Sequence, residues 1–87
     1  MPAFVYVLRC ADDSLYCGWT TDPKRRLREH RAGTAARYTR SRGPVELVAQ
    51  REFADRSQAM SFEASFKRLS RGEKLAEIEA WPPPPSG

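Results

Sequence analysis

The chain has 87 residues, a formal net charge of +4, 40% hydrophobic residues and 30% charged residues. This length predicts one small domain, and the balance of apolar and charged residues excludes an intrinsically disordered protein. The longest apolar run, residues 3–8, is too short to cross a bilayer, and no signal-peptide pattern precedes it. We therefore expect a cytoplasmic protein with no membrane partner.

Arginine carries most of the positive charge, with twelve arginines among the 15 basic residues. A guanidinium group grips phosphate through two parallel hydrogen bonds and stacks on bases, so this bias favours a nucleic-acid partner. A GC-rich genome produces the same bias in any protein, and composition leaves both explanations open. The two cysteines, Cys10 and Cys17, have no matching Cys or His pair for a zinc site and are expected to be reduced thiols.

The chain begins with two segments that predict a β-hairpin. Residues 3–10 are apolar, aromatic and β-branched, and residues 14–20 form a second such run after the turn residues 11–13. Because side chains alternate between the two faces of a sheet, the length of the loop decides which residues of the two strands share a face.

A three-residue loop places Tyr6 opposite Gly18 and Leu8 opposite Tyr16, so the two tyrosines lie on one face as diagonal neighbours. Gly18 would then leave an open space in front of Tyr6, where a ligand backbone could approach. A loop of two or four residues would put the tyrosines on opposite faces.

Each tyrosine by itself is more often a core residue than a catalyst, because aromatic residues favour sheets. To act as a general base, Tyr6 or Tyr16 must lower a pKa of about 10 toward neutrality. A nearby arginine and a metal ion would lower that pKa, so a catalytic role for either tyrosine depends on cationic neighbours.

A cationic helix is predicted to follow the hairpin. The Asp-Pro pair at 22–23 supplies an N-cap and a first helical residue, and Gly33 ends the helix after about Ala32. Arg26 and His30 are an i,i+4 pair on one face of this helix. Arg26 could clamp a scissile phosphate, and His30 could pass a proton or bind a phosphate. The alternative is a solvated basic face on which neither residue meets a ligand.

Residues 33–44 show no clear periodicity and are predicted to form a basic loop. Three of its arginines alternate with one aromatic residue and two hydroxyls, an arrangement in which arginines hold phosphates while the aromatic ring stacks on a base. These candidate nucleic-acid contacts are Arg37, Tyr38, Arg40 and Arg42. The alternative is a mobile charged loop.

The rest of the chain predicts a third strand, two helices and a tail, over residues 45–53, 56–69, 73–80 and 81–87. Asp55 is the expected N-cap of the longer helix. One domain is therefore expected over residues 1–80, and Trp81 with the prolines after it is expected to form an exposed, disordered tail.

Glu63 lies among the apolar positions of the longer helix, inside the arc that should face the sheet. A carboxylate there is costly to bury unless a cation or hydrogen-bond donors meet it. A divalent metal ion is one such cation. The alternative is Lys67 at i+4, which would make an ordinary helical ion pair.

The arrangement as a whole resembles the GIY-YIG nuclease family, most closely its small standalone bacterial members. The resemblance covers about residues 3–75, with Val5-Tyr6-Val7 at the first triplet, Tyr16-Cys17-Gly18 at the second, and Arg26, His30 and Glu63 in order behind them. The first triplet departs from Gly-Ile-Tyr, Cys17 replaces an aliphatic residue, and Trp19 stands where excision-repair relatives carry a lysine.

The resemblance implies an α+β fold with a three-stranded antiparallel sheet flanked by helices. It also implies phosphodiester hydrolysis with one Mg²⁺ or Mn²⁺ ion. Carried over to this chain, Glu63 holds the metal and Arg26 steadies the phosphate, while Tyr16 or Tyr6 activates the attacking water with help from His30. DNA is the expected substrate, with RNA as a second one to test. The residues expected to contact it are Gly18, Arg37, Tyr38, Arg40, Arg42 and Lys67.

Two other functions fit the same sequence. One is a non-catalytic nucleic-acid-binding module of the same fold, which would bind through the basic loop. The other is a protein-interaction adaptor whose Trp81 and following prolines dock to a partner as a polyproline II helix.

Overall fold

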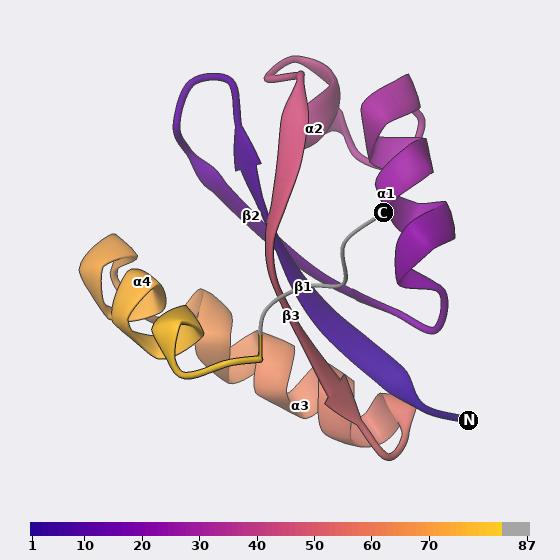
Figure 1. Ribbon diagram of the computed structural model, residues 1–87, viewed down its shortest axis with the longest axis vertical. Helices are drawn as coiled ribbons and strands as arrows, with labels where there is room; N and C mark the ends of the chain where they lie inside the picture. The colour runs from indigo at the N-terminus through magenta and orange to yellow at the C-terminus, as the bar shows by residue number, and fades with distance from the viewer. Residues whose placement is uncertain (83–87) are drawn as a thin grey trace.

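The computed structural model describes residues 1–82 and shows a three-stranded antiparallel sheet with helices on both faces (Figure 1). The strand order is β2-β1-β3. The elements are β1 (Ala3–Cys10), β2 (Leu15–Thr20), α1 (Pro23–Ala32), α2 (Arg37–Arg40), β3 (Val45–Phe53), α3 (Arg56–Lys67) and α4 (Arg71–Glu79). This arrangement confirms the predicted α+β fold. Among these helices, none has the length and apolar character that a membrane span requires.

The hairpin register confirms the prediction from a three-residue loop. Tyr6 pairs with Gly18 and Leu8 pairs with Tyr16, in an antiparallel ladder between β1 and β2. Strand β1 also pairs with β3 along its whole length, with an irregularity in register between Val7 and Leu8. Because β1 is central, its side chains are buried on both faces, which explains its nearly continuous apolar sequence.

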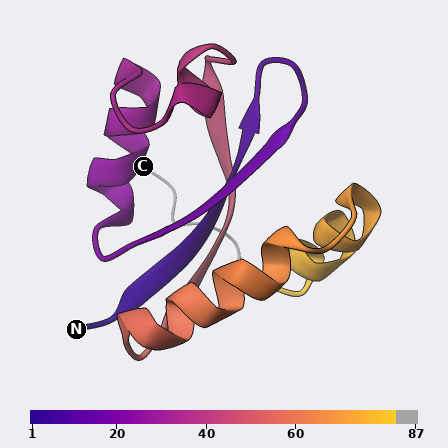
Figure 2. The same cartoon turned by 180° about the vertical axis from the view of Figure 1, so that it is seen from behind.

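Alternation along the strands divides the apolar residues into two cores, one on each face of the sheet. Helices α1 and α2 cover one face, and α3 and α4 cover the other, as the views from front and back agree (Figures 1 and 2). The core under α1, here called the α1-side core, is built on Tyr6, Leu8, Cys10 and Val45. The core under α3, the α3-side core, is built on Ala3, Val5, Val7, Cys17, Ala49, Ala59, Phe66 and Trp81.

Local capping explains where the helices begin. The Asp22 side chain accepts a hydrogen bond from the backbone of Arg25 at the start of α1, and Asp55 accepts one from Gln58 at the start of α3. Ser70 and Glu73 form a capping box at α4. This box makes α4 begin before the predicted residue 73, and α3 ends at Lys67, two residues before its predicted end.

Two predictions for the loops and tail are wrong. The basic segment at residues 33–44 contains the short helix α2, held by contacts with α1 that no local pattern encodes. Trp81 is 7% exposed rather than solvent-exposed, because its indole packs against Phe62 and Phe66 with ring centroids 5.7 and 5.4 Å away. The domain boundary at residue 80 stays a prediction, and the rest of the proposed disordered tail, residues 83–87, lies outside the described residues.

Candidate active site

Four aromatic side chains meet on the α1 side of the sheet. The Tyr6 and Tyr16 rings, from neighbouring strands, have centroids 6.4 Å apart. The His30 imidazole of α1 lies edge-on to both, at 5.5 Å from Tyr6 and 5.0 Å from Tyr16. Tyr38 of α2 adds a further ring, 5.8 Å from Tyr16. The sequence prediction that the two tyrosines share a face is confirmed, and His30 lies beside them.

A buried chain of hydrogen bonds fixes His30 in this cluster. The Tyr6 hydroxyl lies 2.8 Å from His30 Nε2, and His30 Nδ1 lies 2.8 Å from the Thr39 hydroxyl. Thr39 donates its only proton to the backbone carbonyl of Ala36 at 3.3 Å. Its oxygen therefore accepts from a protonated Nδ1, which leaves Nε2 as the acceptor of the Tyr6 proton. The network selects one tautomer of a neutral imidazole.

Burial shifts the pKa values of both members of the Tyr6–His30 pair. Desolvation raises the pKa of Tyr6 to about 12, although a hydrogen bond with Arg26 partly opposes the rise. Desolvation lowers the pKa of His30, and the positive charge of Arg26 lowers it further. Both shifts favour the uncharged forms, so Tyr6 keeps its proton and His30 stays neutral near pH 7.

Arg26 lies at the edge of this cluster, with its side chain 38% exposed. Its Nη1 donates to Glu29 at 3.1 Å, and Glu29 also accepts from Arg25 Nε at 3.3 Å. The hydrogen bond with Tyr6 raises the pKa of Arg26, and the hydrogen bond with Arg26 lowers the pKa of Glu29. Arg26 thus joins the buried tyrosine to the solvent-facing side of α1.

The space in front of Tyr6 is not open, and this corrects the expectation for Gly18. Gly18 is itself buried, and a Cβ placed on it would lie 2.5 Å from the Tyr6 hydroxyl oxygen and 2.7 Å from Cζ. The Tyr6 ring occupies the position that a side chain at residue 18 would need. Gly18 therefore makes room for the catalytic candidate rather than for a ligand backbone.

Glu63 is placed apart from the other four predicted site residues. It extends from α3, which covers the opposite face of the sheet, and its side chain is 17% exposed. Its ionic partner is Lys67 at 3.6 Å, the pair expected from their i,i+4 spacing. Glu63 lies near Cys17 of β2. Burial raises the pKa of Cys17 to about 12, and the negative charge of Glu63 contributes to this rise. Within residues 1–82, no hydrogen bond or ion pair joins it to Tyr6, Tyr16, Arg26 or His30, and no three acidic, cysteine or histidine side chains group as a metal site.

The basic segment divides into arginines with internal partners and arginines that face solvent. Arg42 donates to Asp12 at 3.1 Å and to the backbone carbonyl of Tyr38 at 3.3 Å. Its guanidinium also lies over the Tyr38 ring, 4.0 Å from the centroid. The face of Tyr38 under Arg42 is therefore not available to a base, contrary to the expected stacking role. Arg37 and Arg40 are exposed and fit the predicted phosphate contacts better.

A cleft of about 310 Å³ opens beside Arg26, at the free edge of β2. Its lining includes Trp19 from β2, Arg25 and Glu29 from α1, and Arg56 from the start of α3. No sequence pattern indicates that these residues meet, since they come from three elements. Thr39 was missed for the same reason. One signal was available for Arg56. It lies two helical turns before Glu63, so the two side chains are expected on the same side of α3.

Comparisons with known proteins identify the relatives of this chain. The profile of the GIY-YIG catalytic domain matches residues 2–76. A UPF0213 protein of Streptococcus sanguinis is 52% identical over 77 residues, with 88% of each chain covered, and one of Natronomonas pharaonis is 54% identical over 71 residues, covering 82% and 84%.

Two solved structures resemble the fold. A solution NMR structure of a UPF0213 protein of Bacillus halodurans is 44% identical with a TM-score of 0.60. A solution NMR structure of a protein of E. faecalis is 43% identical with a TM-score of 0.64. Each comparison covers 91% of this chain and 84% of the other.

Proposed function

This chain belongs to the GIY-YIG family, and on that premise we propose that it is a metal-dependent endonuclease that hydrolyses DNA phosphodiester bonds. The observation that carries the proposal is the convergence of Tyr6, Tyr16, Arg26 and His30 on one face of the sheet. This set offers two tyrosine hydroxyls, an imidazole and a guanidinium cation, which are groups that phosphodiester hydrolysis can use.

The two tyrosines differ in what they can do for a water molecule. Tyr6 is 3% exposed and donates its proton to His30, and burial raises its pKa to about 12. Tyr16 is only half-buried, and its hydroxyl makes no hydrogen bond with another residue of the described 1–82. We therefore assign Tyr16 the contact with the attacking water. The Tyr6 and His30 rings pack against the ring of Tyr16 and hold it in place.

Arg26 is the group best placed to stabilise the negative charge of the reacting phosphate. Part of its guanidinium is fixed by Glu29, and the rest faces Tyr6 and the cleft. A guanidinium held in position before the reaction loses little freedom when the charge on the phosphoryl oxygens grows. Removing this side chain should therefore reduce the rate more than it reduces binding.

The proposed metal ion is Mg²⁺ or Mn²⁺, and Glu63 is the residue that would hold it. Mg²⁺ is often bound by one or two carboxylates together with waters and substrate phosphate oxygens, so a single carboxylate is a chemically suitable donor. Glu63 would exchange its contact with Lys67 for the ion. Glu63 lies two helical turns from Arg56, which lines the same cleft as Arg26, so an ion held by Glu63 would supply a Lewis acid for phosphate oxygens at this edge of the sheet.

Cutting of single-stranded and branched DNA oligonucleotides with Mg²⁺ or Mn²⁺ tests the proposal. Glu63→Ala should lower the rate by at least about a hundredfold, because a metal contribution is worth several kcal/mol. Glu52→Ala, which removes an exposed carboxylate from β3, is the matched control and should cut like the parent. Equal rates for parent and Glu63→Ala would show that Glu63 holds no catalytic metal.

A second candidate function is a nucleic-acid-binding module without turnover. It is favoured by one observation, the pairing of Glu63 with Lys67 away from the aromatic cluster. This alternative predicts no cutting with any divalent metal. It also predicts DNA binding that falls steeply with salt and is equal for the parent and Glu63→Ala.

A further inference from the structure

The cleft beside Arg26 has walls of two different kinds. One wall is aromatic: part of the Trp19 indole packs against the α3-side core, and the remainder lines the cleft. The other walls carry guanidinium groups from Arg25 and Arg26 on α1 and from Arg56 on α3. An aromatic surface next to several cations is the combination that single-stranded nucleic acids bind.

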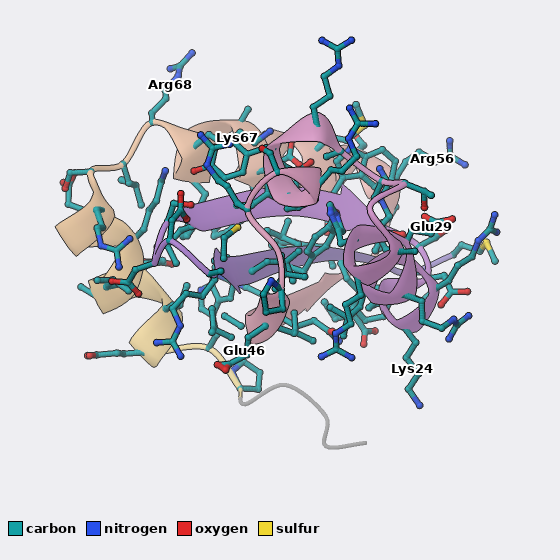
Figure 3. All side chains as sticks on the ribbon, turned by 90° about the horizontal axis from the view of Figure 1, so that it is seen from above. Lys24, Glu29, Glu46, Arg56, Lys67 and Arg68 are labelled. Carbon is teal, nitrogen blue, oxygen red and sulfur yellow. The ribbon has the colours of Figure 1, made fainter. Side chains whose placement is uncertain are left out.

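The arginines of the cleft differ in how far they are already engaged. Arg25 and Arg26 both bind the Glu29 carboxylate, which occupies one side of each guanidinium. Arg56 takes part in none of the ion pairs found among residues 1–82 and is exposed. Figure 3 shows Glu29 and Arg56 at the same end of the molecule, on α1 and α3 respectively. Arg56 is therefore the arginine of this cleft whose donors are free for a phosphate.

We propose that this cleft binds one unpaired nucleotide next to the scissile phosphate, with its base stacked on Trp19 and its phosphate held by Arg56. The inference rests on the proposed nuclease function and narrows it, because it makes single-stranded DNA the substrate at the point of cutting. Arg26 belongs both to the cleft and to the aromatic cluster. A nucleotide in the cleft is consequently a direct neighbour of the phosphate that Arg26 contacts.

Two physical reasons favour an unpaired nucleotide at this position. A base inside a duplex is stacked on both faces, so Trp19 can reach the face of a base only when that base is unstacked. The volume of about 310 Å³ also lies in the range of small-molecule sites, which suits a single nucleotide.

Tryptophan fluorescence provides a direct test, because the chain contains only two tryptophans and Trp81 is buried in the α3-side core. The protein is titrated with a short single strand of thymidylates in EDTA, so that no cutting occurs. Stacking on Trp19 should quench the emission. The same strand with abasic sites, and a duplex of the same length, should bind through phosphates without this quenching. Equal quenching by the abasic strand would overturn the proposal.

Substitutions at Trp19 and Arg56 separate the role of the indole ring from that of the guanidinium group. Trp19→Leu should bind the thymidylate strand about tenfold more weakly and the abasic strand as before, since stacking on an aromatic side chain contributes on the order of 1–3 kcal/mol per base. Trp19→Phe, which keeps a smaller aromatic surface, should recover part of the loss and shows that folding is not the cause. No loss in Trp19→Leu would overturn the stacking role.

Arg56→Gln should weaken binding of both strands and reduce the slope of log affinity against log salt by about 0.7, the value for one phosphate on a single strand. Arg68→Gln is the matched control, because Arg68 lies at the other end of α3 (Figure 3) and outside the cleft. Equal slopes for Arg56→Gln and the parent would contradict the phosphate contact.

These results do not depend on turnover. Base-dependent quenching without any cutting would refute the nuclease proposal and keep the subsite. Cutting that proceeds on duplex DNA and is unchanged by Trp19→Leu would refute the subsite and keep the nuclease.

Discussion

His30 shows how single side chains are constrained at the candidate site. It is the only histidine of the chain, it is 2% exposed, and both of its ring nitrogens are hydrogen-bonded, to Tyr6 and Thr39. Such a ring cannot rotate without breaking two buried hydrogen bonds, each of which is costly to leave unmade. His30 is therefore a fixed acceptor for the Tyr6 proton, and Thr39 is the residue that selects its tautomer.

This burial should make the stability of the protein depend on pH. Because the folded state lowers the pKa of His30, the stability from the neutral ring is complete above the ordinary pKa of about 6.5 and is lost as the pH falls below it. We expect the free energy of unfolding in urea to decrease between pH 6.5 and 5.5, by at most about 1.4 kcal/mol per pH unit.

His30→Gln removes the titrating group and should show a flat profile over the same interval, whatever its absolute stability. Glu29, the carboxylate one residue before His30, has a pKa below its usual range, so it titrates at lower pH and does not interfere. A parent protein as stable at pH 5.5 as at pH 7 would show that the imidazole is not held in its neutral form.

At the scale of elements, the short helix α2 is held by its surroundings rather than by its own sequence. Four residues are too few for an isolated helix. The backbone N–H of Ala11 in the β1–β2 turn donates to the carbonyl of Arg42 at 2.8 Å, and the Arg42 side chain bonds Asp12 in the same turn. Arg42 thus ties the hairpin turn to α2, and through α2 it supports Thr39 beneath His30.

Arg42 and Arg40 should therefore respond differently to the same substitution. Arg42→Gln should lower the free energy of unfolding by about 1 kcal/mol, the typical contribution of a charged hydrogen bond combined with a cation–π contact at a partly exposed site. Arg40→Gln should leave stability unchanged, because Arg40 is exposed, and should weaken binding to a DNA strand. Urea unfolding and titration of a labelled strand measure the two effects. An equal loss of stability in both variants would contradict the structural role of Arg42.

At the scale of the whole molecule, each face of the sheet carries its own core, and the C-terminal residues complete one of them. Trp81 follows α4 directly and returns to the α3-side core, where it meets Phe62 and Phe66. Its indole N–H donates to Glu77 at 3.4 Å. A domain of this size buries a limited apolar area, so one large ring is a substantial share of its stability.

Truncated chains measure how much the Trp81 ring contributes to the free energy of unfolding. A chain that ends at Ala80 should lose about 3 kcal/mol or more of unfolding free energy relative to a chain that ends at Pro82, in line with the removal of buried tryptophans elsewhere. The comparison isolates Trp81 from the residues that follow Pro82. Equal urea midpoints for the two truncated chains would show that the buried Trp81 indole does not contribute measurably to stability.

The fold was largely predictable because its signals are local. Asp22 and Asp55, as N-cap residues, predicted where two helices begin. A three-residue turn predicted the strand register that places Tyr6 and Tyr16 on one face of the sheet. Residues whose role depends on distant partners were not predictable. Thr39 looked like a loop hydroxyl, and Trp81 looked like part of a tail, because nothing in the flanking sequence indicates what either side chain packs against.

The close approach of Tyr6 to Gly18 also has an evolutionary consequence. Since any Cβ at position 18 would overlap the Tyr6 ring, the two positions cannot vary independently. A lineage that replaces Gly18 must first or simultaneously shorten residue 6, and would then leave Nε2 of His30 without its donor. We therefore expect Tyr6, Gly18 and His30 to vary together among homologous proteins rather than one at a time.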